Sequence, residues 1–173
     1  GTCAANILEN PGAEDLDGHG SHTSSTAAGN PATATFRGND ISVSGVAPRA
    51  NVILYDTCWF NTTTNTGPCG TVALVQAVNQ VVADGVVDVV NYSISGGTQP
   101  WTDSIAQAFL AAHEAGIYVS ASAGNAGPGA STNGHSTPWV TTVGASTHTR
   151  GTIAYFLSAS GPGTPPAGTQ NIL

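Results

Sequence analysis

From about residue 50 the chain alternates between short β-branched runs and longer segments with helical periodicity, and no other feature restricts its fold as strongly. Residues 51–55 form an apolar run bounded by Pro48, which favours a strand. Residues 71–84 repeat apolar side chains at helical spacing and stop at Gly85, which is typical of a helix that ends at a glycine. The same pattern predicts a strand at 86–93, a helix from Asp103 to Ala115, and strands at 117–123 and 139–145.

Nearly continuous apolar strands that alternate with helices predict an α/β fold, in which a parallel sheet carries helices on both faces. We expect residues 1–153 to form this unit. Residues 154–173 are rich in Gly and Pro without periodicity, which is typical of an extended linker leaving a domain. Ligands of such sheets bind beyond the carboxyl ends of the strands, so the polar, glycine-rich segments 93–97 and 124–127 are the first places to look for a site.

The charge of the chain excludes one class of partner. Its formal net charge is −7, lysine is absent, and only three basic residues occur among 173. Because such a surface repels a phosphate backbone, we exclude nucleic acid as a partner. No apolar run approaches the roughly 20 residues that a membrane-spanning helix needs, so we predict no membrane partner either.

The three cysteines bear on the compartment in which the protein works. Cys58 and Cys69 bracket a stretch rich in Thr and Asn that has the composition of a loop, which a disulfide between them would close. A disulfide requires an oxidising compartment and therefore favours a secreted protein. The alternative is a pair of reduced, buried thiols. On the disulfide interpretation, Cys3 is left over or pairs outside this sequence.

The first candidate for chemistry is His19, which opens a short run of small residues that ends at Gly29. This pattern predicts a short helix that packs close to a neighbouring segment. A histidine at its first turn, with glycine on both sides, is accessible and suits a general base. Two alternatives stay open: His19 and His22 are a metal-binding pair at helical spacing, or both are ordinary residues at a helix end.

Two further candidates follow strands. Asn125 comes after a buried strand, where its amide can donate a hydrogen bond to a developing oxyanion without adding charge; a plain turn is the alternative. The backbone of residues 93–96 can pair with an extended peptide if it runs along a sheet edge; a buried strand that leads into a loop is the alternative.

Five motifs, in this order and at these separations, resemble the subtilisin-like serine proteases over roughly residues 12 to 150. Residues 15–29 are especially similar to the large secreted branch with a protease-associated domain inserted in the catalytic domain. The motifs are Gly18-His19-Gly20-Ser21-His22, Gly45-Val46-Ala47-Pro48, Asn91-Tyr92-Ser93-Ile94-Ser95-Gly96-Gly97, Ser122-Ala123-Gly124-Asn125 and Val143-Gly144-Ala145.

The resemblance implies a role for individual residues. It implies that His19 is the general base of an Asp-His-Ser triad, that Asn125 is the side-chain donor of the oxyanion hole, and that His22 is structural. It further implies two walls of a substrate-binding cleft. One wall consists of Ser93, Ile94, Ser95 and Gly96, and the facing wall of the main specificity pocket consists of Ser122, Ala123 and Gly124. Ser95 departs from the family, which usually has glycine there.

Other parts of the family's machinery do not match this sequence. The family's nucleophile lies in Gly-Thr-Ser-Met-Ala, and this chain contains no methionine. The family's acid comes from a separate, earlier strand and is followed by Ser-Gly or Thr-Gly, a pattern that Asp17 does not fit. We therefore expect the amino-terminal half of a secreted subtilisin-like endopeptidase, inert by itself, whose partners are a polypeptide substrate and the remainder of the same protease.

The alternative is a non-catalytic module that only binds peptides. Neither interpretation requires a cofactor, and we assign no metal ligand. Structural calcium is frequent in the family, but no acidic loop here matches such a site.

Overall fold

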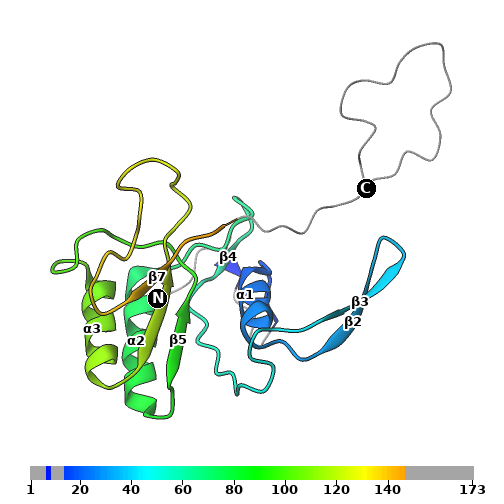
Figure 1. The fold of residues 1–173 in the computed structure, drawn as a ribbon. Coiled ribbons are helices and arrows are strands. Elements are labelled where there is room, and N and C mark those ends of the chain that lie inside the picture. Colours follow the sequence, from blue (N-terminus) through cyan, green and yellow to red (C-terminus); the bar gives the residue numbers. More distant parts are fainter. Residues whose placement is uncertain (1–6, 9–13, 147–173) are drawn as a thin grey trace.

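The computed structural model describes residues 7–8 and 14–146. Cys3 and the predicted linker at 154–173 lie outside the described residues. The elements follow one another as shown in Figure 1: β1 (Ile7–Leu8), α1 (His19–Ala28), β2 (Ala32–Phe36), β3 (Asn39–Val43), β4 (Phe60–Asn61), α2 (Thr71–Asp84), β5 (Val89–Tyr92), α3 (Ser104–Glu114), β6 (Tyr118–Ser122) and β7 (Thr141–Val143).

A three-stranded parallel sheet with the order β5-β6-β7 is the centre of the fold. Its register pairs Val90 with Val119 and Ala121 with Thr142. The predicted α/β class with a parallel sheet is thus confirmed. Each strand is shorter than the apolar run that predicted it, because ladder hydrogen bonds form only where a neighbouring strand lies alongside, whereas the apolar composition extends further.

Helices α2 and α3 begin and end where local chemistry predicted. Gly85 follows α2 with a φ of 62°, a left-handed conformation that glycine adopts without strain. The Asp103 carboxylate caps α3 by accepting a hydrogen bond of 2.8 Å from the Ala106 N–H. The predicted ends of both helices are therefore correct to within a residue.

The core lies between these two helices and one face of the sheet. Phe109 and Ala112 of α3 and Val119 and Ala121 of β6 are almost fully buried, and the Trp139 indole N–H donates to the Ala106 carbonyl at 2.8 Å. Its buried apolar members are Leu74, Val78, Val81, Tyr92, Ile105, Ala106, Ala108, Phe109, Ala112, Ile117, Val119, Ala121 and Trp139.

Helices on both faces of the sheet were predicted, and the described residues show them on one. The residues that alternate with the buried ones are half exposed: Val89 to 59%, Tyr118 to 52% and Val143 to 52%. Helix α1 contacts none of the three strands and stands apart from the sheet in Figure 1.

The strand predicted at 51–55 does not form within the described part of the chain, and this prediction is wrong. A β-strand is defined by hydrogen bonds to a neighbour, and none of the described residues pairs with this run. Val52 and Ile53 are half exposed and Leu54 is 71% exposed. Tyr55 nevertheless packs against the core, and its hydroxyl bonds the Asp84 carboxylate at the end of α2.

Helix α1 packs closely against a neighbouring segment, as its small residues predicted. The Gly45 N–H donates to the Gly29 carbonyl at 2.8 Å, and the Ala47 N–H donates to the Ala27 carbonyl at 2.8 Å. A Cβ at position 45 would lie 2.3 Å from the Gly29 nitrogen, so only glycine fits there. Between the two segments, β2 and β3 form an antiparallel hairpin that the sequence had not indicated.

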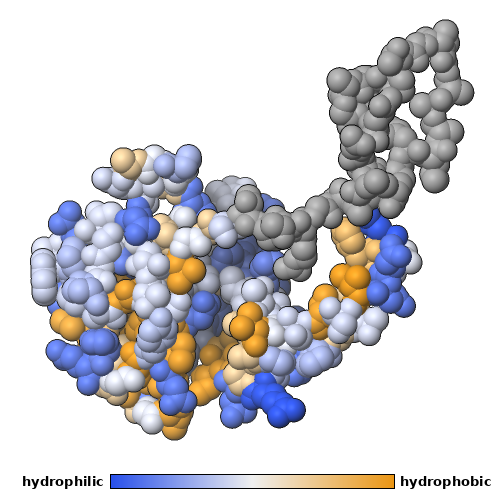
Figure 2. Space-filling model, viewed as in Figure 1, coloured by the Kyte–Doolittle hydropathy of each residue, from blue (hydrophilic) through white to orange (hydrophobic). Residues whose placement is uncertain are grey.

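The hairpin carries apolar side chains on its surface. Phe36 is 57% exposed, and Ile41 and Val43 are each 43% exposed. The hairpin projects away from the sheet in Figure 1, and in the same view Figure 2 shows hydrophobic and hydrophilic surface side by side along it.

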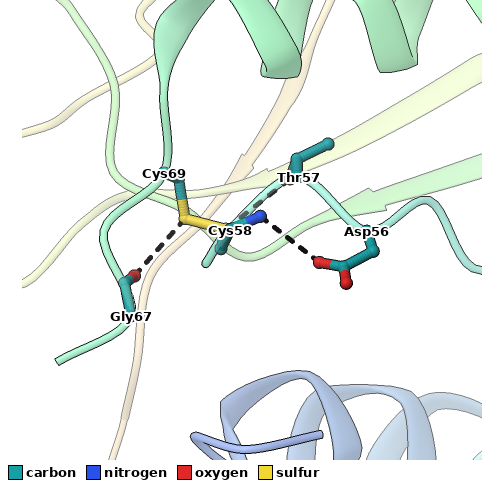
Figure 3. The surroundings of a disulfide bond; sticks show 5 residues. All are labelled: Asp56, Thr57, Cys58, Gly67 and Cys69. Carbon is teal, nitrogen blue, oxygen red and sulfur yellow. Dashed lines mark hydrogen bonds between the residues drawn. A yellow bond between two sulfur atoms is a disulfide. The ribbon is translucent and has the colours of Figure 1, made fainter. Parts of the chain in front are cut away.

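The cysteine-bracketed stretch is a closed loop. Cys58 and Cys69 form the predicted disulfide, with their Cα atoms 4.1 Å apart (Figure 3). Backbone hydrogen bonds join the two sides of the loop, from the Trp59 N–H to the Pro68 carbonyl and from the Asn61 N–H to the Thr66 carbonyl. Within this loop β4 pairs with β1, so the loop fastens the start of the described chain.

Candidate active site

A cleft of about 380 Å³ lies at the carboxyl ends of β5 and β6. It brings together parts of the two segments that the resemblance implied as walls: Ser95 and Gly96 of one, and Ala123 and Gly124 of the other. The other three residues expected in these walls are not among the lining residues: Ser93, Ile94 and Ser122. None of the lining side chains is charged, and five of the nine lining residues are glycine or alanine. The lining residues are Ser95, Gly96, Thr98, Ala123, Gly124, Asn125, Ala126, Thr132 and Gly134.

Hydrogen bonds tie the two walls to one another and to the sheet. The Ser122 hydroxyl donates to the Ile94 carbonyl at 3.2 Å, which links the end of β6 to the segment after β5. The Ala123 N–H donates to the Val143 carbonyl at 2.8 Å, and the Ala123 carbonyl accepts from the Gly134 N–H at 3.0 Å. The walls are therefore held by the strands and are not free loops.

Asn125 is one of the residues that line the cleft. Gly124, directly before it, has a φ of 83° and turns the chain out of β6. Among the described residues nothing hydrogen-bonds the Asn125 side chain, so its amide is available to a ligand. Across the cleft, the Ser95 hydroxyl oxygen lies 3.3 Å from where a Cβ of Gly124 would be, so the Ser95 side chain narrows this part of the cleft.

His19 is the first residue of α1 and is exposed. It follows Gly18, whose φ of 90° is a left-handed conformation that places the chain for the first turn. It is not part of the cleft lining. In Figure 1, α1 begins at the end of the molecule where β5 finishes.

Asp15 holds the first turn of α1, a role that the sequence analysis missed. Its Oδ1 accepts from the Gly18 N–H at 2.8 Å and the Asp17 N–H at 3.1 Å, and its Oδ2 accepts from the Ser21 N–H at 2.7 Å. Hydrogen bonds from the backbone of Gly18, then of Ser21, lower the pKa of Asp15 to about 2. The signal was present, because an acidic residue shortly before a helix is a common capping group.

The disulfide-closed loop touches the same segment. A Cβ at Gly67 would lie 3.3 Å from the Asp17 Cγ, so the loop packs against the residue two before His19. The loop that the disulfide closes therefore lies beside the segment that leads into α1.

His135 is a second residue that sequence reasoning missed. It is 2% exposed, and its ring packs edge-on against Tyr92 at 5.2 Å and against Phe109 at 5.7 Å between ring centroids. Its Nε2 lies 2.9 Å from the Ile94 carbonyl oxygen. The only signal in the sequence was the pair of glycines at 96–97, which indicates that another group approaches this backbone closely.

The described residues also bear on two other kinds of feature, a metal site and a membrane-spanning helix. Within residues 7–8 and 14–146 no three His, Cys, Asp or Glu side chains are arranged to hold a metal ion. None of the helices in the described part of the chain is long and apolar enough to cross a membrane.

Comparison with known proteins finds a matching family model and several curated relatives. A family model described as "Subtilase family" matches residues 5–167. Subtilisin-like protease SBT1.7 of Arabidopsis thaliana is 41% identical over 150 residues, which cover 85% of this chain and 19% of that protein. Subtilisin-like protease SBT1.6 of the same plant is 45% identical over 139 residues, covering 77% and 17%. The chain spans about a fifth of the length of the curated relatives it matches.

Proposed function

The chain belongs to the subtilase family of serine proteases, and we propose that it contributes the histidine, the oxyanion-hole asparagine and the peptide-binding walls of a secreted endopeptidase. One observation carries the proposal. Two short segments that are far apart in sequence line a single uncharged cleft at the carboxyl ends of parallel strands: Ser95 and Gly96 on one side, and Ala123, Gly124 and Asn125 on the other. A substrate peptide that enters this cleft has backbone groups on both sides to pair with.

The proposed reaction begins with a serine hydroxyl supplied by the remainder of the same protease. His19 takes the proton of that hydroxyl while its oxygen attacks the carbonyl carbon of the scissile bond. The carbonyl oxygen becomes negatively charged, and the Asn125 amide together with a backbone N–H stabilises it. Collapse of this intermediate breaks the C–N bond, and the leaving amine takes the proton from His19. Water then releases the acyl group by the same steps in reverse.

An aspartate outside the matched motifs is proposed to orient His19, since Asp17 makes no hydrogen bond to the histidine in the described structure. The chain contains no Gly-Thr-Ser-Met-Ala sequence, so we expect it to be inert without the rest of the protease. The reaction uses side chains and backbone groups alone and needs no cofactor.

Two features support the proposed substrate and location. The cleft lining carries hydroxyl, amide and backbone groups without charge, which suits extended polypeptides with an uncharged side chain at the cleavage position. The Cys58–Cys69 disulfide is stable in an oxidising compartment, which supports secretion.

The test uses the full-length natural protein and an extended peptide substrate. We expect His19→Ala to lower kcat by about 10⁶-fold and Asn125→Ala by about 10²- to 10³-fold, values taken from subtilisin, another member of this family. His113→Ala is the matched control, because His113 is exposed at the end of α3, away from the cleft. Full activity of His19→Ala would disprove the assignment.

One observation supports the alternative, a non-catalytic module that binds peptides: the chain has a cleft but lacks the nucleophile motif. The same experiment separates the two. A wild-type protein that binds the peptide, hydrolyses none of it and does not react with a fluorophosphonate serine probe is a binding module.

A further inference from the structure

A buried imidazole supports one wall of the cleft from beneath. His135 is 2% exposed, and its Nε2 lies 2.9 Å from the carbonyl oxygen of Ile94. Its backbone is bonded on both sides: the N–H donates to the Gly97 carbonyl at 3.0 Å, and the carbonyl accepts from the Thr142 hydroxyl at 2.8 Å. The residue therefore joins β7 to the segment after β5.

The surroundings determine which nitrogen of the ring carries the hydrogen. A carbonyl oxygen only accepts hydrogen bonds, so Nε2 must be the donor. Rotation of the ring is blocked by Tyr92 and Phe109 on its edges and by Gly96, where a Cβ would lie 1.8 Å from the His135 Cε1. The donor thus has one direction available, toward Ile94.

The bond to Ile94 sets the direction of the next backbone N–H. In a trans peptide unit the C=O and the following N–H point in opposite directions, and Ile94–Ser95 is not a cis bond. When His135 and the Ser122 hydroxyl draw the Ile94 carbonyl inward, the Ser95 N–H faces outward. Ser95 lines the cleft, and among the described residues its backbone N–H and C=O have no partner.

The conformation of His135 itself indicates that this arrangement is enforced. Its φ is 51°, in the left-handed region that few residues other than glycine adopt. Such a conformation persists only where surrounding contacts maintain it. Here the contacts are the two backbone hydrogen bonds described above, a third from the Thr137 N–H to the His135 carbonyl at 2.8 Å, and the aromatic packing.

We propose that His135 is a positioning residue for substrate binding: its Nε2–H holds the Ile94 carbonyl inward and thereby presents the Ser95 N–H to a carbonyl group of an extended peptide. This inference rests on the proposed function. It assigns to His135 no contact with the scissile bond. Substitution of His135 should therefore not change the hydrolysis of short substrates that do not reach Ser95.

The test compares two substrates in the full-length natural protein. One is a peptide anilide that extends for several residues before the scissile bond, and the other is a single-residue ester. His135→Leu removes the donor and keeps an apolar side chain, whereas His135→Gln places an amide N–H near the position of Nε2. His113→Gln is the control for an exposed histidine.

For His135→Leu we expect KM for the extended anilide to rise about tenfold, the equivalent of one hydrogen bond, with little change in kcat. The ester should change by less than about twofold, and His135→Gln should restore most of the loss. Equal losses on both substrates, or no loss on the anilide, would overturn the proposal.

Two further measurements test the proposal if His135→Leu does not fold or if the wild type hydrolyses neither substrate. If His135→Leu does not fold, nitrogen-15 NMR of the wild-type ring must show the Nε2–H tautomer, and a Nδ1–H tautomer would overturn the proposal. If the wild type hydrolyses neither substrate, the proposed function fails. Amide hydrogen exchange then tests the role of His135 in peptide binding. Added peptide should protect the Ser95 amide from exchange in the wild type but not in His135→Leu. Absence of that protection would overturn the inference as well.

Discussion

Replacement of Asp15 by asparagine tests how the first turn of α1, and with it His19, is held. The carboxylate accepts three backbone hydrogen bonds, from Asp17, Gly18 and Ser21. Asparagine has one acceptor oxygen in place of two, so the bond from the Ser21 N–H is lost and an amide N–H faces another donor. We therefore expect the first turn of α1 to open more often in Asp15→Asn.

The magnitude follows from the pKa of Asp15. Its lowering from 3.8 to about 2 corresponds to about 2.5 kcal/mol in favour of the ionised carboxylate. Because Asp15 is exposed, solvent screening reduces this to about 1 kcal/mol, within the range measured for helix caps. That value corresponds to about fivefold faster hydrogen exchange.

The assay is amide hydrogen exchange of residues 18–21 in the natural protein at pH 7 and at pH 2. Because the pKa of Asp15 is lower in the folded than in the unfolded state, its contribution is present above pH 3.8 and is lost as pH falls toward 2. The difference between wild type and Asp15→Asn should therefore shrink at pH 2. Asp17→Asn is the control, since the Asp17 side chain makes no hydrogen bond in the described structure. Identical exchange at pH 7, or an undiminished difference at pH 2, would refute the reasoning.

Three further predictions concern packing and the disulfide. Phe109→Ala should lower the free energy of unfolding by about 3 to 5 kcal/mol in denaturant titrations, because Phe109 is 0% exposed; a loss below about 1 kcal/mol would contradict this. Gly45→Ala should speed hydrogen exchange at the end of α1, because its Cβ would lie 2.3 Å from the Gly29 nitrogen, and Gly38→Ala, which meets no atom, should not affect that helix end. Replacing Cys58 and Cys69 together by serine should destabilise the loop by about 3 kcal/mol, seen as earlier proteolytic cleavage between residues 58 and 69; unchanged cleavage would speak against a stabilising role.

Much of the candidate site could be predicted from the sequence, because its parts lie on short motifs next to predicted strands. The segments around Ser95 and Asn125 were found in this way, and the structure places both in one cleft. His135 was not found. Its importance comes from Ile94, 41 residues away in the chain, and no local pattern reports such a contact.

The sequence by itself determined the elements whose ends are local. Helix α2 ends at Gly85, which adopts the left-handed conformation, and helix α3 begins after Asp103, whose carboxylate caps it; neither requires a distant partner. Tertiary structure decided whether an apolar run becomes a strand. Residues 51–55 have the composition of β5 and β6 but no ladder partner in the described structure, so they stay irregular. Helix hydrogen bonds join residues four apart, whereas ladder and cleft contacts join segments that meet only when the chain has folded.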